Sequence, residues 1–301
     1  MGVVITVNCE VSKMEINETI QYEDGIFRWA GLAHNQEWAL LCGNAAEALG
    51  HLEAESIDCI VTSPPYYSLR DYGVDGQIGL EDTINEYVNS LCTVTTELYR
   101  VLKKDGLLFL NLGDTYYSGK GASHGKDSKS HKRRFGLRPV DKSGGLGANI
   151  ERKSIIGIPW RVAIQMTAQH WVLRAPIIWH RDKVLPESVK DRPHRSYEYV
   201  FMFAKDRKYF FNRQPLLDKQ IDEDVWTIAA RPSGTEIDTA PYPDELVSRC
   251  LAIGCPEHGT VLDPFVGSGT TMAVALRSGR NAIGIDISRT FCDYILEHLE
   301  E

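Results

Sequence analysis

Apolar runs alternate with amphipathic stretches along most of the chain from residue 36 onward. Short runs rich in aliphatic and β-branched residues predict strands, and apolar residues spaced three and four apart predict helices. The predicted strands are Trp38–Cys42, Ile57–Thr62, Gly106–Leu112, Val172–Trp179, Tyr197–Ala204, Thr260–Asp263 and Asn281–Ile285. The predicted helices are Ala45–Leu52, Ile84–Leu102, Pro159–Gln169, Asp244–Ile253, Thr270–Ser278 and Ser288–Leu299. This alternation predicts an α/β fold: a mixed, mostly parallel sheet with helices on both faces.

The same pattern predicts one main domain over residues 36–301, preceded by an extension over 1–35 that the pattern does not place. A Gly-, Ser- and Lys-rich stretch interrupts the domain at 115–153. A loop of this length inside a compact domain is usually functional or disordered. We therefore interpret 115–153 as an inserted basic loop.

Charge is distributed unevenly along the chain, whose net charge is -8. Residues 117–153 hold ten Lys and Arg against three Asp and Glu, and residues 174–213 hold ten against five. Two basic stretches on an acidic scaffold predict a local positive face for a polyanion. For either stretch alone, solvated surface charge is the better interpretation.

The seven cysteines form no CxxC pair, which favours reduced thiols over disulfides or a zinc site. No apolar run approaches the roughly 20 residues of a membrane span, and the first residues lack the pattern of a secretory signal. These features predict a cytoplasmic protein without a membrane partner.

A glycine turn follows the predicted strand that ends at Asp263. Gly267 and Gly269 let the backbone pass close to a ligand, and the helix that opens at Thr270 offers free N–H groups. Asp286 ends the next strand, about twenty residues later, where a carboxylate can accept hydrogen bonds from ribose hydroxyls. The pattern predicts a nucleoside-binding strand–turn–helix–strand unit.

A nucleotide-dependent dehydrogenase is the alternative for this unit. Its fingerprint has a third glycine, but Thr270 and Thr271 follow the glycine pair here. The missing glycine favours a ligand without a pyrophosphate. Asp263 and Phe265 suit an adenosylmethionine ligand, with an acid for its amino group and an aromatic ring for its sugar and base.

A stiff loop, Ser63-Pro64-Pro65-Tyr66, directly follows the predicted strand that ends at Thr62. Ser63 and Pro64 each precede a proline and are held extended. The Ser63 hydroxyl and Pro64 carbonyl could accept both hydrogen bonds of an aromatic amine and draw its lone pair out of conjugation. Tyr66 could stack on a base flipped from the duplex, for about 1–3 kcal/mol. A rigid turn is the alternative, which the nucleoside-binding unit in the same chain disfavours.

With Ser63–Tyr66 ahead of Asp263–Thr271, the sequence resembles the amino-DNA methyltransferases of β-type motif order. The resemblance runs from about residue 38 to 299 and includes the stretches 106–116, 155–163, 177–193, 195–205 and 240–247. It implies a Rossmann-like methyltransferase fold with a circularly permuted motif order. It also implies S-adenosyl-L-methionine as cofactor and double-stranded DNA as substrate, with Trp38–Asn44 beside the strand that ends at Asp286.

The resemblance and the motifs together give three sets of expected site residues. The expected catalytic residues are Ser63, Pro64, Pro65 and Tyr66. The expected cofactor-binding residues are Asn44, Pro241, Leu246, Asp263, Phe265, Gly267, Gly269, Thr270 and Asp286. The expected DNA-binding residues are Tyr67, Lys132, Arg133, Arg134, Trp179, Asp191 and Arg192. Asn44 stands where the family often has an aspartate, so we expect a weaker contact there.

The resemblance implies direct in-line methyl transfer without a covalent intermediate. Serine at position 63 resembles the cytosine-N4 subgroup, and N6-adenine methylation is the close alternative. A protein-glutamine or RNA methyltransferase would usually place the cofactor motif first, and a non-catalytic DNA-binding module would not need the loop. The family is often dimeric, so a homodimer is a candidate partner. A cognate restriction enzyme is a second candidate. We expect recognition of the DNA site in 115–152 and around 206–225.

Overall fold

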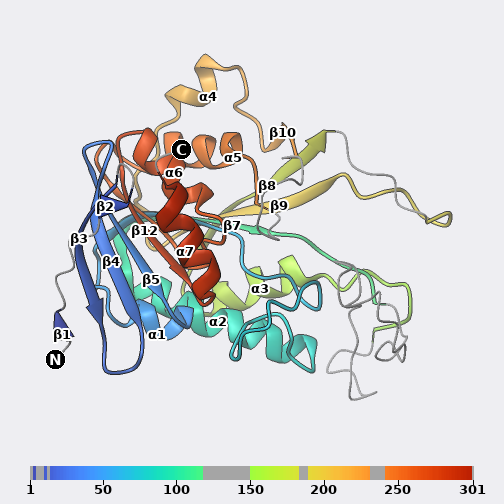
Figure 1. Cartoon of the computed structure of the whole chain (residues 1–301). Coiled ribbons are helices and arrows are strands. Elements are labelled where there is room, and N and C mark those ends of the chain that lie inside the picture. The colour runs from blue at the N-terminus through green and yellow to red at the C-terminus, as the bar shows by residue number, and fades with distance from the viewer. Residues whose placement is uncertain are drawn as a thin grey trace.

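A single twisted sheet runs through the molecule in the computed structural model, which describes residues 3–4, 10–11, 14–117, 150–182, 189–230 and 241–299 (Figure 1). The strand order is β1-β3-β4-β5-β12-β11-β6-β7-β9-β8-β10, with β2 paired to β3. None of the described helices is long and apolar enough to cross a bilayer.

Five parallel strands form the centre of the sheet. In spatial order they are β5 (Gln36–Cys42), β12 (Asn281–Asp286), β11 (Thr260–Asp263), β6 (Ile57–Thr62) and β7 (Leu102–Leu112). β5, near the N-terminus, pairs in parallel with β12, near the C-terminus. The expectation that these two strands lie side by side is confirmed, and with it the permuted order of the chain.

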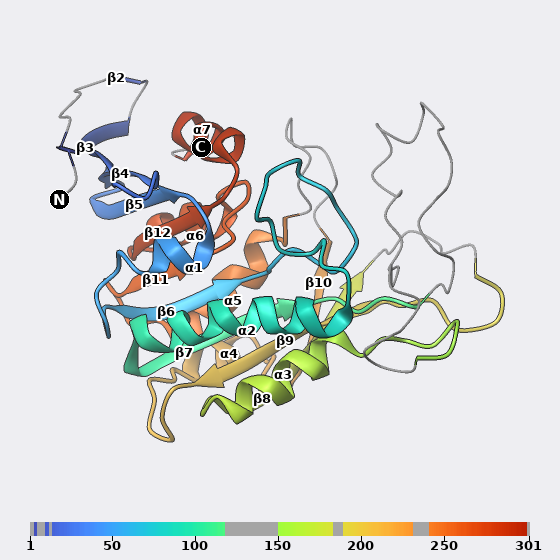
Figure 2. The same ribbon diagram turned by 90° about the horizontal axis from the view of Figure 1, so that it is seen from below.

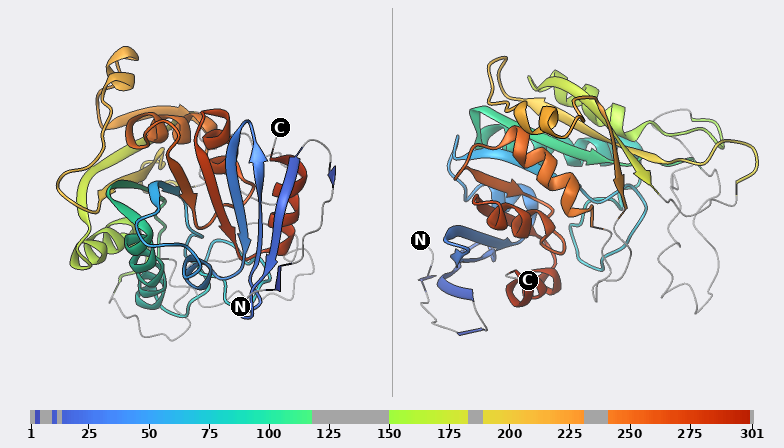
Figure 3. Two further views of the ribbon diagram at one scale, coloured as in Figure 1. Left: turned by 90° about the vertical axis from the view of Figure 1, so that its left-hand side faces the viewer. Right: turned by 90° about the horizontal axis from the view of Figure 1, so that it is seen from above.

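The flanking strands make the sheet mixed. β9 (Tyr197–Ala204) runs antiparallel between β7 and β8 (Val172–Asp182), and β10 (Val225–Ala229) pairs in parallel with β8. At the other edge β4 (Phe27–Ala33) pairs antiparallel with β5, and β3 (Met14–Gln21) pairs antiparallel with β4 (Figure 3, left). The N-terminal extension therefore belongs to the sheet. Two short strands complete it: β1 (Val3–Val4) and β2 (Glu10–Val11).

Helices cover both faces of the sheet, as the apolar pattern predicted. On one face lie α1 (Ala45–Leu49), α2 (Ile84–Val101) and α3 (Ile158–Ala168) (Figure 2). On the other lie α5 (Asp244–Gly254), α6 (Thr270–Arg277) and α7 (Arg289–His298) (Figure 3, right). The short helix α4 (Gln214–Asp218) projects from the edge near β10.

Strand β7 shows why both faces must be covered. Leu107 and Phe109 pack into the apolar core under α5, α6 and α7, whereas Leu108 and Leu110 pack into the core under α1, α2 and α3. Successive side chains on a strand point to opposite faces, so a continuous apolar run needs a layer on each side. The carboxyl ends of the central strands then share one edge, and the loops that leave this edge form the candidate site.

Candidate active site

A cavity of about 380 Å³ opens at the carboxyl ends of the central strands. It is lined by the loop after β6, the turn after β11, the end of β12 and Asn44, which precedes α1. The expected catalytic loop and the expected cofactor turn therefore share one cavity. The expected residues that line it are Asn44, Ser63, Pro64, Pro65, Tyr66, Trp179, Pro241, Asp263, Phe265, Gly267, Thr270 and Asp286.

The turn between β11 and α6 is shaped by two glycines with left-handed backbone conformations. The φ angle is 53° at Gly267 and 87° at Gly269, and Gly269 caps the N-terminus of α6. The Gly267 N–H donates to Oδ2 of Asp286 at 2.9 Å, and the Ser288 N–H donates to Oδ1 at 2.8 Å. Burial raises the pKa of the Asp286 carboxyl to about 7. Asp286 thus fixes the turn and presents a carboxyl whose charge changes near neutral pH.

Asp263 ties three elements together. Oδ1 accepts hydrogen bonds from Thr62 Oγ1 at 2.6 Å and from the Phe265 N–H at 3.0 Å. Oδ2 accepts from Tyr242 OH at 2.8 Å and from Thr271 Oγ1 at 2.6 Å. Burial raises the pKa of this carboxyl. With four donors around it, Asp263 acts mainly as a support for the cavity wall, although it also lines the cavity.

Other expected cofactor residues divide between the cavity and the core. Asn44 lines the cavity, and its side-chain oxygen accepts from the Ala46 N–H at 3.0 Å to cap α1. Leu246 is only 2 % exposed and belongs to the apolar core under α5, not to the cavity lining. A contact of Leu246 with the cofactor stays a prediction. Tyr242, which sequence reasoning missed, lines the cavity instead.

Hydrogen bonds with α2 and with the segment before α2 fix the position of the catalytic loop. Tyr87 OH donates to the Pro65 carbonyl at 2.7 Å, and the Ser68 N–H donates to the Gly79 carbonyl at 2.7 Å. Helix α2 itself begins at a capping box, in which Thr83 and Glu86 each accept the backbone N–H of the other. The Pro65 carbonyl thus already accepts a hydrogen bond from α2, whereas Ser63 and Pro64 line the cavity wall.

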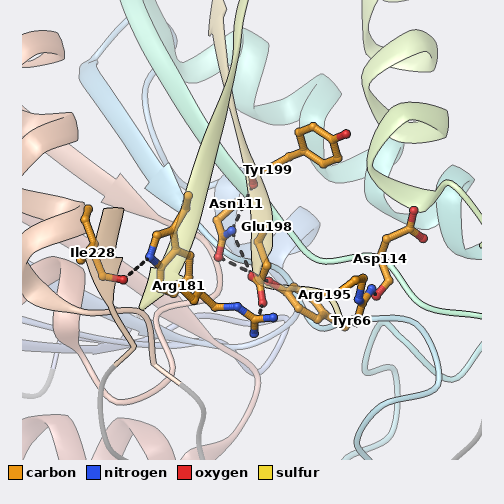
Figure 4. A network of polar contacts seen from close by, with 9 residues as sticks. Tyr66, Asn111, Asp114, Arg181, Arg195, Glu198, Tyr199 and Ile228 are labelled. Carbon is orange, nitrogen blue, oxygen red and sulfur yellow. Dashed lines mark hydrogen bonds and ion pairs between the residues drawn. The ribbon is translucent and has the colours of Figure 1, made fainter. Parts of the chain in front are cut away.

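The phenol of Tyr66 takes part in a polar network that sequence reasoning missed (Figure 4). It donates to Oε2 of Glu198 at 2.6 Å and lies 3.3 Å from Oδ1 of Asn111. Arg181 donates to the other carboxylate oxygen of Glu198 at 3.0 Å. Burial and the Glu198 charge hold the pKa of Tyr66 well above its ordinary value, while a hydrogen bond with Ser63 lowers it. Tyr66 therefore stays a protonated donor at neutral pH.

The expected DNA-binding residues lie in different surroundings. Tyr67 is 3 % exposed and packs on the Tyr87 ring, which disfavours the expected contact with DNA. Trp179 is also buried, with its indole N–H donating to the Ile228 carbonyl at 3.0 Å, but it lines the cavity. Lys132, Arg133 and Arg134 lie outside the described residues.

Asp191 and Arg192 lie beside the two ends of the inserted loop. Asp191 pairs with Lys153 at 2.6 Å, which lowers the pKa of the aspartate. The Arg192 guanidinium lies 3.8 Å from the centre of the Tyr116 ring. Tyr116 and Ile155 form a β-bridge, so the insertion leaves and rejoins the fold at one point. Residues 118–149 are outside the described residues.

Residues 206–224 lie at the edge of the sheet opposite the cavity. The Phe210 N–H donates to the carbonyl of Asp105, near the amino end of β7, and Lys205 Nζ donates to the Leu102 carbonyl at 2.8 Å. The catalytic loop follows the carboxyl end of β6, which is parallel to β7. This position disfavours the expected recognition of the DNA site by residues around 206–225, because the segment lies at the edge opposite the catalytic loop.

Comparison with known proteins agrees with this geometry. Residues 57–297 match the model of the DNA methylase family that covers N6 and N4 methylases. The chain belongs to this DNA methylase family. It is 39 % identical over 269 residues to Type II methyltransferase M.SmaI of Serratia marcescens, covering 86 % of this chain and 90 % of that protein. It is 37 % identical over 265 residues to M.Cfr9I of Citrobacter freundii, covering 86 % of each.

Solved structures share the fold of this DNA methylase. The PvuII DNA methyltransferase, described as cytosine-N4-specific, superposes with a TM-score of 0.65 at 20 % identity, covering 86 % of this chain and 85 % of that one. A Thermus thermophilus protein complexed with S-adenosyl-L-methionine superposes with a TM-score of 0.58 at 23 % identity, covering 86 % and 92 %. The expected Rossmann-like methyltransferase fold is confirmed.

S-adenosylmethionine is the methyl donor of this DNA methyltransferase, and the cavity fits it. The N-terminus of α6 offers backbone N–H groups for a carboxylate. Asp286 can accept hydrogen bonds from ribose hydroxyls, and Phe265 provides an apolar ring at the cavity wall. Among the residues that the structure describes, no group of three or more His, Cys, Asp or Glu side chains could hold a metal ion.

Proposed function

We propose that this methyltransferase transfers a methyl group from S-adenosylmethionine to the exocyclic N4 amine of cytosine in double-stranded DNA. The observation that carries the proposal is that Ser63 and Pro64 line the same cavity as Asp286 and the glycine turn. A cavity of about 380 Å³ is too small for a stacked duplex, so the target base enters it flipped out.

The residues of the loop have separate tasks in this proposal. S-adenosylmethionine supplies a methyl group on a sulfonium. The Ser63 hydroxyl and the Pro64 carbonyl accept the two hydrogen bonds of the amine, which localises its lone pair for in-line attack. The Tyr66 ring stacks on the flipped base. Ser63 is no strong base, so the proton passes to water after transfer.

Cytosine is favoured over adenine by the serine at position 63, which lacks the charge of an aspartate. The PvuII enzyme that shares the fold is described as cytosine-N4-specific. Adenine N6 is the second candidate, because the family model spans both kinds of enzyme. A protein-glutamine or RNA substrate is disfavoured by the order of the motifs and by the Type II methyltransferases among the relatives.

Duplex DNA is the proposed partner, and Trp179 and Arg192 are the described residues that we place on its side. The names of the Type II relatives favour a cognate restriction enzyme as a second partner. A homodimer remains a proposal from the family resemblance.

Two loop variants test the proposed chemistry with duplex DNA and labelled cofactor. Ser63→Ala and Tyr66→Ala should abolish methyl incorporation while calorimetry shows that cofactor binding is largely kept. Ser56→Ala is the matched control, because Ser56 lies just before β6 at the opposite edge and its hydroxyl donates to the Glu53 carbonyl within that turn. Full activity in both loop variants would overturn the assignment.

A further inference from the structure

Glu198 is a partly buried acid for which neither the loop motif nor the cofactor motif provides a role. It lies on β9, its side chain is 13 % exposed, and it lines the catalytic cavity. Its Oε2 accepts the hydrogen bond of the Tyr66 phenol at 2.6 Å. A hydrogen bond to a carboxylate is shorter and roughly twice as strong as one between neutral groups.

The carboxylate of Glu198 is itself held from two further sides. Arg181 on β8 donates to Oε1 at 3.0 Å, and the Asn111 amide lies 3.3 Å from Oε2 (Figure 4). Asn111 is in turn fixed by its hydrogen bond to the Tyr199 carbonyl at 3.1 Å. Because these residues sit on β7, β8 and β9, the anchor of the Tyr66 phenol is built on neighbouring strands of the sheet and not on a loop.

The ring of Tyr66 is confined at its edge as well as at its hydroxyl. A β-carbon placed on Gly113 would lie 2.6 Å from Cε2 of Tyr66, closer than side-chain carbons approach in proteins. Gly113 directly follows β7, the strand that carries Asn111. With the hydroxyl anchored and one ring edge against backbone, rotation of the ring about its Cα–Cβ bond is restricted.

We propose that Glu198, held by Arg181, is a positioning residue that fixes the orientation of the Tyr66 ring for stacking on the flipped base. The inference rests on the proposed function of the loop and adds the residues that orient it. The anchor holds the Tyr66 ring in its stacking orientation before the flipped base enters. Binding of the base therefore costs less rotational freedom of the ring.

A direct role in the reaction is the competing interpretation of Glu198, because a carboxylate near the cavity could stabilise positive charge on the base or accept its proton. The two roles differ in their dependence on the Tyr66 hydroxyl. A positioning residue acts through that hydroxyl, whereas a direct acceptor acts without it.

A double-mutant cycle of Glu198→Gln and Tyr66→Phe separates the two roles. The readouts are the single-turnover rate of methylation of plasmid DNA and the Kd values for cofactor and DNA. Each single variant should lower the rate about tenfold, as loss of one charge-assisted hydrogen bond implies, with both Kd values nearly unchanged. The double variant should be no slower than the slower single variant.

Two outcomes overturn the proposal: no effect of Glu198→Gln on the rate, or an effect that is as large in the Tyr66→Phe background as in the wild type. Glu55→Gln is the matched control, because Glu55 also pairs with a basic side chain, Lys205, but at the opposite edge. If Glu198→Gln lowers the melting temperature strongly, the cycle is run with Glu198→Asp and read in the same way. Failure of the wild-type enzyme to methylate an exocyclic amine would contradict the proposed function and not this inference alone.

Discussion

Thr62 Oγ1 donates a 2.6 Å hydrogen bond to Oδ1 of Asp263, and both residues are almost fully buried. Thr62 is the last residue of β6 and Asp263 is the last residue of β11, so this bond joins the strand that carries the catalytic loop to the strand that carries the cofactor turn. The two strands are already paired in the sheet, and this buried side-chain bond adds a direct link between the ends from which the two halves of the cavity are built.

Replacing Thr62 by valine should destabilise the fold and weaken cofactor binding. Valine keeps the shape but leaves one lone pair of the buried Asp263 carboxylate without its donor, which costs about 1–3 kcal/mol. Denaturant unfolding would measure the stability and calorimetry the cofactor affinity. Thr62→Ser, which keeps the hydroxyl, is the control. Wild-type stability in Thr62→Val would show that the bond contributes nothing.

Asp286 should make cofactor binding depend on pH around neutrality. Its pKa is raised to about 7, so the carboxyl is mostly protonated below that pH in the free protein. Ribose hydroxyls donate best to the ionised form, so binding lowers this pKa. Affinity should therefore rise with pH up to about 7 and level off above it, by at most about tenfold per unit.

Calorimetric titration with cofactor from pH 5.5 to 8.5, a range of about three units around that pKa, checks this expectation. Asp286→Asn cannot ionise and should bind more weakly but without the pH dependence. An identical pH profile in the wild type and in Asp286→Asn would assign the effect to another group.

Gly113→Ala should slow methylation with little change in cofactor affinity. The added methyl group would lie 2.6 Å from the Tyr66 ring, which must then move away from its position beside Glu198. Gly113 does not itself line the cavity. Single-turnover rates and cofactor Kd values, measured together, would show the split. A lower cofactor affinity with an unchanged rate would contradict the placement of Gly113.

Arg192→Ala should weaken DNA binding with little effect on cofactor binding. If Arg192 contacts a phosphate, the slope of log K against log salt should fall in magnitude by about one. Arg207→Ala is the matched control, because Arg207 is exposed on the segment 206–224 at the edge opposite the cavity. Equal losses of affinity in the two variants would contradict the assignment of the DNA side.

The sequence predicted the parts of the site that are local in the chain. The turn at Gly267 and Gly269, the acid Asp286 and the stiff loop at Ser63 each owe their geometry to neighbouring residues, so a short stretch of sequence was sufficient. Strands and helices were predicted for the same reason, since buried elements carry clear periodic patterns.

Residues that reach the site through tertiary structure could not be predicted from the local sequence. Glu198 and Tyr242 meet the loop and the turn only because β9 and the start of α5 fold against distant strands. Tyr67 and Leu246 were placed at the site because they adjoin motif residues, but neighbours in sequence point in different directions and both side chains enter the core. The position of the segment 206–224 could not be predicted, because the direction of β9, which carries the chain away from the cavity, was not visible in its composition.

Identification of the modified nucleoside tests the proposed methylation of cytosine at N4. Duplex DNA is methylated with isotope-labelled S-adenosylmethionine, digested to nucleosides and analysed by mass spectrometry, with Ser63→Ala as the blank. We expect label in N4-methyldeoxycytidine. Label in N6-methyldeoxyadenosine, or no label in DNA, would contradict it.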